Sequence, residues 1–215
     1  HATNDVKSLL SHPDIDYVFR GEAELAFPEL IKSYGKNKIP RVKGVYSKED
    51  IERKVPIAEK CDLVNNIDEI PFPDWDLIDV KSYSTGEIVR KREFLSGKES
   101  KLFTIMTSRG CPYQCTYCAS PNMWLPRWIP RDPLDVVDEI EHYVRTYGAR
   151  NFPFQDLTAI IQKDWIVKFC KEIIRRKLDI TWLLPTGTRS EAINAEVATL
   201  LKERSEEHTS ELQSR

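Results

Sequence analysis

The sequence lacks the features that would mark a membrane protein, a disulfide-linked secreted domain or a nucleic-acid-binding protein. No run of apolar residues approaches the ~20 that a membrane helix needs, so we expect no membrane span. There are only five cysteines in 215 residues and no signal peptide, so we expect reduced thiols and a cytoplasmic protein. The 32 Lys and Arg residues nearly balance 34 Asp and Glu residues, which gives no basic field for nucleic acid. A hydrophobic content of 40% allows one to two globular domains.

Three of the five cysteines gather in one short segment, as Cys111, Cys115 and Cys118 with the spacing C-x3-C-x2-C. Gly110 and Pro112 flank the first of them and predict a shaped loop. A 4Fe–4S cluster held by three thiolates has one iron without a protein ligand, and that iron can bind a substrate or cofactor. The motif therefore predicts a metal centre with an open coordination position.

Two other interpretations of these cysteines remain. A structural zinc site needs four ligands, and the fourth would have to come from His142 or Cys170, both in helical patterns far along the chain. An iron–sulfur protein that only transfers or senses electrons would also need a fourth protein ligand. Cys61 stands alone in its segment and is predicted not to be a ligand. Cys170 lies on an apolar helical stripe and is predicted to be a core residue.

The cysteine spacing, with the aromatic Tyr117 before the last cysteine, resembles the radical S-adenosylmethionine (SAM) superfamily. The resemblance implies a 4Fe–4S cluster whose open iron chelates the amino and carboxylate groups of SAM. It implies an enzyme that cleaves SAM reductively to methionine and a 5′-deoxyadenosyl radical, which then attacks a small-molecule substrate. A reductant such as flavodoxin or ferredoxin would supply the electron.

The same resemblance implies roles for individual residues around the cofactor. Tyr117 is assigned to the cofactor site with the cysteine motif. Asp156 stands where the family often places a group near the amino end of SAM, and Arg189 would face its carboxylate or the substrate. The alternatives are that Asp156 caps the following helix and that Arg189 is a surface or capping residue. The sequence predicts no catalytic residue.

Residues 1–48 predict the end of an α/β domain, with a helix to Leu10, a strand over 15–20, a helix over 22–34 and a short strand over 42–46. The segments 16–24 and 27–30 resemble the C-terminal part of the Rossmann-like cobalamin-binding domain that precedes many radical SAM domains. The resemblance adds cobalamin as a third cofactor, with methyl transfer or cyclisation as reactions. The family's cobalt-ligating His motif lies earlier in that domain and is absent here. A bare cobalamin-binding module is a further alternative, and the missing His motif weighs against it.

Residues 49–98 predict a Pro-rich linker, and residues 99–203 predict the N-terminal half of a radical SAM domain. Strands are expected over 102–107, 151–155 and 180–184, each followed by a helix. The helix over 133–147 is expected to bury one stripe, namely Leu134, Val137, Ile140, Val144 and Tyr147. Successive βα units predict parallel strands with right-handed crossovers, and the resemblance implies a partial TIM-type barrel. Its active site is expected at the C-terminal ends of the strands.

The two ends of the sequence carry further expectations. Residues 204–215 resemble the translation of a common sequencing adapter, and we expect a non-native tail there. The chain is accordingly expected to be a truncated fragment and inactive by itself. Residues 184–192 resemble the branch named for anaerobic magnesium-protoporphyrin monomethyl ester cyclase.

Overall fold

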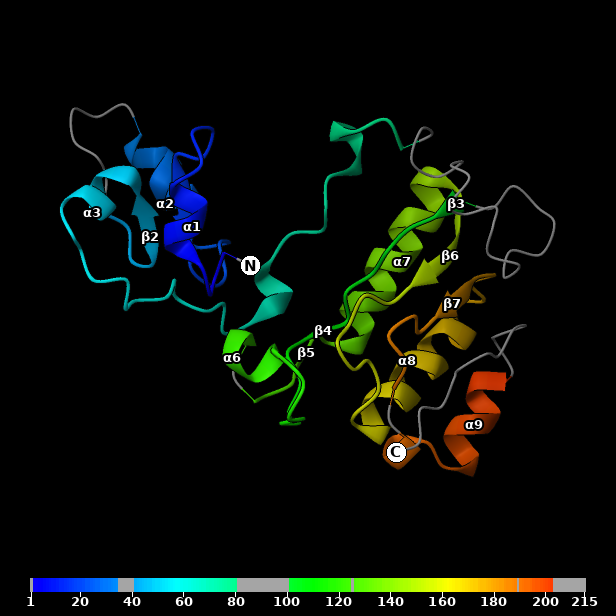
Figure 1. The fold of residues 1–215 in the computed structure, drawn as a ribbon. Coiled ribbons are helices and arrows are strands. Elements are labelled where there is room, and N and C mark those ends of the chain that lie inside the picture. Colours follow the sequence, from blue (N-terminus) through cyan, green and yellow to red (C-terminus); the bar gives the residue numbers. More distant parts are fainter. Residues whose placement is uncertain (1, 35–40, 81–100, 125, 189, 203–215) are drawn as a thin grey trace. The chain divides into compact units, whose positions relative to one another are not determined.

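The computed structural model describes residues 2–34, 41–80, 101–124, 126–188 and 190–202 (Figure 1). The chain divides into two compact units, and each is described by itself. The first unit comprises His1–Ile70 and Tyr113–Leu125, and the second comprises Pro71–Pro112 and Pro126–Arg215. The division therefore passes through the cysteine loop, between Pro112 and Tyr113.

The first unit alternates short helices with two short strands. In order these are α1 (Val6–Leu10), β1 (Tyr17–Phe19), α2 (Ala26–Ser33), β2 (Val45–Ser47), α3 (Lys48–Glu52), the 3-10 turn η1 (Ile67–Glu69) and α6 (Ser120–Trp124). The strands β1 and β2 pair antiparallel, with Val18 opposite Tyr46. These two residues pack with Val6 and Leu10 of α1 in one small core.

A local side-chain cap explains where α1 begins, whereas α2 begins without one. The Asp5 carboxylate accepts a hydrogen bond from the Ser8 N–H at 3.3 Å and so caps the start of α1. The second helix begins at Ala26, later than the predicted Glu22. Gly21 has a φ of +110°, and the buried Glu22 carboxylate accepts the Val64 N–H at 2.9 Å. The Gly21–Glu22 turn is therefore held by the chain that follows β2.

Part of the segment predicted as a linker packs within the first unit. The Cys61 N–H donates to the Arg20 carbonyl at 2.8 Å, and Cys61 is buried with Leu30 and Val42. The Glu59 N–H donates to the Tyr46 hydroxyl at 3.0 Å. Residues outside any regular strand thus complete this small core, because their backbone N–H groups find acceptors in Arg20, Tyr46 and Glu22.

The second unit contains a parallel sheet in the order β3 (Lys101–Leu102), β6 (Ala149–Pro153) and β7 (Thr181–Leu183). The helices α7 (Pro133–Tyr147), α8 (Lys163–Arg175) and α9 (Ala195–Lys202) alternate with these strands (Figure 1). The remaining elements are η2 (Trp75–Leu77), β4 (Ser108–Arg109), β5 (Ile129–Pro130) and η3 (Ser190–Ala192). The predicted succession of βα units with parallel strands is confirmed.

The helix α7 shows how the sequence sets both ends of an element. Asp132 caps its start by accepting the Leu134 N–H at 2.7 Å, and Pro133 occupies the first turn. Gly148 ends it with a φ of +69°, in the left-handed region. The buried stripe is Val136, Val137, Ile140 and Tyr143. The prediction that Leu134 belongs to this stripe is wrong, since its side chain is exposed beside the helix start.

The core of the second unit lies between the sheet and its helices. Trp165, Ile166, Phe169, Cys170 and Ile173 of α8 are buried, which confirms the prediction that Cys170 is a core residue. From the Pro-rich segment, the Trp75 ring packs on Phe103 with centroids 5.2 Å apart. No helix among the described residues is long and apolar enough to cross a membrane.

We predict that Gly44→Ala destabilises the first unit more than Gly148→Ala destabilises the second. Both glycines have positive φ, +74° and +69°. A Cβ at residue 44 would lie 2.7 Å from the Cα of Cys61 and closer still to neighbouring backbone atoms, whereas nothing lies within 4 Å of one at residue 148. The expected losses of unfolding free energy are about 3 kcal/mol and about 1 kcal/mol. Urea unfolding measures both, and equal losses would contradict the crowding at residue 44.

We predict an acid-sensitive contribution to stability from Glu172 on α8. Arg175 and Arg176 donate hydrogen bonds to its carboxylate at 2.6–2.7 Å, which lowers its pKa to about 2. Since the pKa is depressed in the folded state, this stability is present above the ordinary value of 4.5 and is lost as pH falls toward 2. Glu172→Gln should therefore be less stable than the wild type near pH 7, with the difference narrowing in acid. A difference in urea unfolding that is independent of pH would contradict this assignment.

Candidate functional site

The loop that carries the three cysteines has two paired strands, β4 and β5, at its base. The strand β4 directly precedes Gly110 and Cys111, and it pairs antiparallel with β5, which follows the loop. Ser108 lies opposite Pro130, and Arg109 lies opposite Ile129. Gly110 has a φ of +77°, which a residue with a side chain rarely adopts. The pairing of β4 with β5 therefore holds the two ends of the cysteine loop together.

A buried carboxylate fixes the strand that leads into this loop. Asp156 is only 1% exposed, and it accepts the Thr107 N–H at 3.1 Å, the Thr107 hydroxyl at 2.9 Å and the Ser108 hydroxyl at 2.6 Å. Burial raises the pKa of Asp156, while these donors act in the opposite direction. The alternative that Asp156 caps the next helix is wrong, because α8 begins at Lys163 after Gln162. Asp156 instead links the end of β6 to the base of the cysteine loop.

Arg131 holds the residues that directly precede β4. The Arg131 N–H donates to the Thr107 carbonyl at 2.9 Å, and its guanidinium donates to the Met106 carbonyl at 3.1 Å. The guanidinium is largely buried and pairs with Asp135 and Glu139 of α7. These carboxylates raise the pKa of Arg131 against the effect of burial. Sequence reasoning missed this residue, although its spacing of four and eight residues from the two acids was a usable signal.

None of the three loop cysteines forms a disulfide, and each is partly exposed. Cys111 belongs to the second unit, where its Sγ lies 3.6 Å from the Thr158 hydroxyl. Cys115 and Cys118 belong to the first unit. The Cys118 Sγ accepts the Ser120 N–H at 3.4 Å and lies 3.3 Å from the Ser120 hydroxyl, contacts that lower the pKa of the thiol. Such a shift favours the thiolate, which is the form that binds metals.

The structure does not gather every residue that the sequence assigned to the cofactor. Tyr117 is 92% exposed, and Arg189 lies outside the described residues. Within the described ranges, no group of three or more His, Cys, Asp or Glu side chains is arranged to hold a metal ion. The donor set itself, three partly exposed cysteines on one loop that form no disulfide, fits an iron–sulfur cluster with an open iron.

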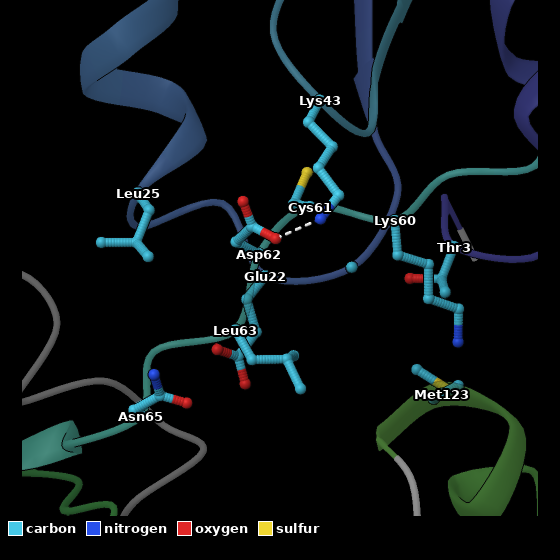
Figure 2. Close-up of a pocket in the computed structure, with 11 residues that line it drawn as sticks. Thr3, Glu22, Leu25, Lys43, Lys60, Cys61, Asp62, Leu63, Asn65 and Met123 are labelled. Carbon is cyan, nitrogen blue, oxygen red and sulfur yellow. Dashed lines mark hydrogen bonds and ion pairs between the residues drawn. The ribbon is translucent and has the colours of Figure 1, made fainter.

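The first unit holds a cavity of about 620 Å³ beside the Gly21–Glu22 turn (Figure 2). Lys43 and Asp62 form an ion pair in its wall, and the Lys60 ammonium donates to the Asn122 carbonyl at 3.0 Å. The rest of the lining is of mixed polarity, namely Thr3, Gly21, Glu22, Leu25, Cys61, Leu63, Asn65 and Met123. The Gly21–Glu22 turn, which lies in the segment 16–24 that resembles the cobalamin-binding domain, therefore borders a cavity that can hold a small molecule.

Comparison with known proteins gives relatives in sequence and in fold. The chain is 31% identical over 192 residues to an uncharacterised methyltransferase of Pyrococcus horikoshii, covering 89% of this chain and 38% of that protein. It is 30% identical over 174 residues to the anaerobic magnesium-protoporphyrin IX monomethyl ester cyclase of Synechocystis sp., covering 80% and 32%. The chain thus spans well under half the length of these relatives. No protein-family model matches it.

Two solved structures share the fold. The cobalamin-dependent SAM radical enzyme OxsB, solved with aqua-cobalamin and SAM, matches with a TM-score of 0.66 at 18% identity, over 95% of this chain and 28% of that one. The radical SAM methyltransferase TsrM of Kitasatospora setae, solved with cobalamin and a [4Fe-4S] cluster, matches with a TM-score of 0.52 at 16% identity, over 89% and 36%. The mixed α/β architecture with its parallel sheet is therefore that of these proteins.

We predict that iodoacetamide separates the five cysteines of the native protein into two groups. Cys111, Cys115 and Cys118 should be alkylated near pH 7, and Cys118 fastest, because its pKa is lowered. Cys170 should be protected, since burial raises its pKa to about 12, and Cys61 should be protected because it is buried with a raised pKa. Peptide mass spectrometry measures the rates, and all five should react in urea. Reaction of Cys170 as fast as Cys118 in the native protein would contradict this grouping.

Proposed function

Because the chain is related in sequence and in fold to the cobalamin-binding branch of the radical SAM superfamily, we propose that it is part of a radical SAM enzyme. The observation that carries the proposal is the position of the cysteine loop. It follows β4, which comes after the parallel-sheet strand β3 in the chain, and its base is fixed by Asp156, Arg131 and the β4–β5 pairing. Active sites of barrels built from such units lie at this end of the strands.

The proposed roles of the chain's own residues follow from their placement. Cys111, Cys115 and Cys118 would hold a 4Fe–4S cluster, and Asp156 and Arg131 would position the strand that carries the first of them. When bound, the cluster and SAM supply a one-electron cleavage that yields methionine and a 5′-deoxyadenosyl radical. Tyr117 and Arg189 remain proposed cofactor contacts. The chain supplies the ligands and their orientation, while the cofactors supply the bond chemistry.

Cobalamin is the third cofactor of the proposal, as it is bound by both solved structures. The cavity beside the Gly21–Glu22 turn is the proposed place where the first unit meets a small-molecule cofactor or substrate. No His is among the described residues that line it, so we assign no cobalt ligand to this chain. For the whole protein we propose cobalamin-assisted methyl transfer or cyclisation of a small molecule, with flavodoxin or ferredoxin as reductant in the cytoplasm.

We predict that anaerobic reconstitution with iron and sulfide loads about four irons per chain. Cys111→Ala, Cys115→Ala and Cys118→Ala should each lose most of this iron, because each removes one of three ligands. Cys170→Ala is the matched control and should retain it, since Cys170 is a core residue. Iron and acid-labile sulfide assays with the visible absorption spectrum measure the loading.

The reaction is tested on the same samples with dithionite and SAM. Release of 5′-deoxyadenosine and methionine that depends on the three cysteines supports the radical SAM proposal. A stable cluster without SAM cleavage, both in this chain and in the full-length protein, would favour the electron-transfer alternative. Zinc in place of iron, bound by the same three cysteines, would contradict the proposal.

A further inference from the structure

The loop after β6 contacts the segment from Thr107 to Cys111 through two of its residues, Asp156 and Thr158. Asp156 holds Thr107 and Ser108, as described above. Thr158 stands two residues after Asp156, and its hydroxyl oxygen lies 3.6 Å from the Cys111 Sγ. One short loop therefore sets the course of the strand and also contacts the first sulfur of the motif.

This loop is fixed by the segment that follows the third strand of the sheet. The Thr186 hydroxyl donates to the Asp156 carbonyl at 2.5 Å. The Thr188 hydroxyl accepts the Ile160 N–H at 3.2 Å and donates to the Ile160 carbonyl at 3.0 Å. Thr158 lies between these two anchored residues. Its position relative to Cys111 is therefore determined by backbone contacts and not by its own side chain.

The hydroxyl of Thr158 is placed to form a hydrogen bond with the Cys111 sulfur. Thr158 is 7% exposed, so little water competes for the contact with Cys111. The hydroxyl also lies 2.8 Å from the Leu157 carbonyl, to which it donates. When Cys111 is a thiol, its S–H can donate to the Thr158 oxygen. A thiolate sulfur only accepts, and rotation of the hydroxyl hydrogen is enough to direct it at the sulfur.

We propose that Thr158 is a positioning residue that hydrogen-bonds the Cys111 sulfur and thereby raises the reduction potential of the cluster. The inference rests on the proposed cluster. Hydrogen bonds to ligand sulfurs are one of the factors that set cluster potentials. A donor stabilises the reduced state, which carries one more negative charge, more than the oxidised state. Removal of the hydroxyl should therefore make the one-electron reduction harder.

The test compares Thr158→Val, which keeps the shape and removes the hydroxyl, with Thr158→Ser, which keeps the hydroxyl. Thr199→Val is the matched control, because the Thr199 hydroxyl donates to the Ala195 carbonyl within α9 and is exposed. Each reconstituted protein is titrated anaerobically against redox mediators, and the reduced cluster is followed by EPR. Thr158→Ala is measured alongside, since a smaller side chain tests the hydroxyl without crowding.

The expected result is a more negative midpoint potential for Thr158→Val and Thr158→Ala, with Thr158→Ser and Thr199→Val near the wild type and iron content equal in all. Unchanged potentials in both hydroxyl-free variants would overturn the inference while the cluster itself stands. An equal shift in Thr199→Val would also overturn it. A wild type that binds no cluster would instead overturn the proposed function, and the inference with it.

Discussion

The geometry of the cysteine loop depends on one buried carboxylate, that of Asp156. It receives donors from Thr107 and from Ser108 of β4, and it follows β6, the second strand of the parallel sheet. Burying a carboxylate without hydrogen-bond donors costs free energy of folding. Since Asp156 is only 1% exposed, its carboxylate oxygens need these donors. The contact therefore ties the sheet to the segment that carries Cys111.

Further hydrogen bonds and ion pairs hold the residues on both sides of this contact. Arg131 holds the carbonyls of Met106 and Thr107, and its own charge is matched by Asp135 and Glu139 of α7. The Thr186 hydroxyl holds the backbone of Asp156 from the third strand's loop. The parallel sheet thus serves as a rigid base whose C-terminal ends present polar groups to the loop, as in other βα folds.

The sequence alone predicts features that depend on residues close together in the chain. The cysteine motif, the caps at Asp5 and Asp132, and the alternation of strands and helices are local patterns, and the βα order and the burial of Cys170 are confirmed. The network around Asp156 could not be read in this way, because its partners lie 48 and 49 residues away. The same applies to Val64 and Glu22, 42 residues apart, which bind part of the predicted linker into the first unit. Such contacts are decided by tertiary packing.

If Cys111, Cys115 and Cys118 hold the proposed cluster, one iron would be open to SAM. The EPR spectrum of the reduced, reconstituted protein, recorded anaerobically with and without SAM, tests this open iron. We expect a 4Fe–4S signal whose g-values shift when SAM is added, because SAM would coordinate the open iron. A 4Fe–4S signal that SAM leaves unchanged would contradict the proposed open iron.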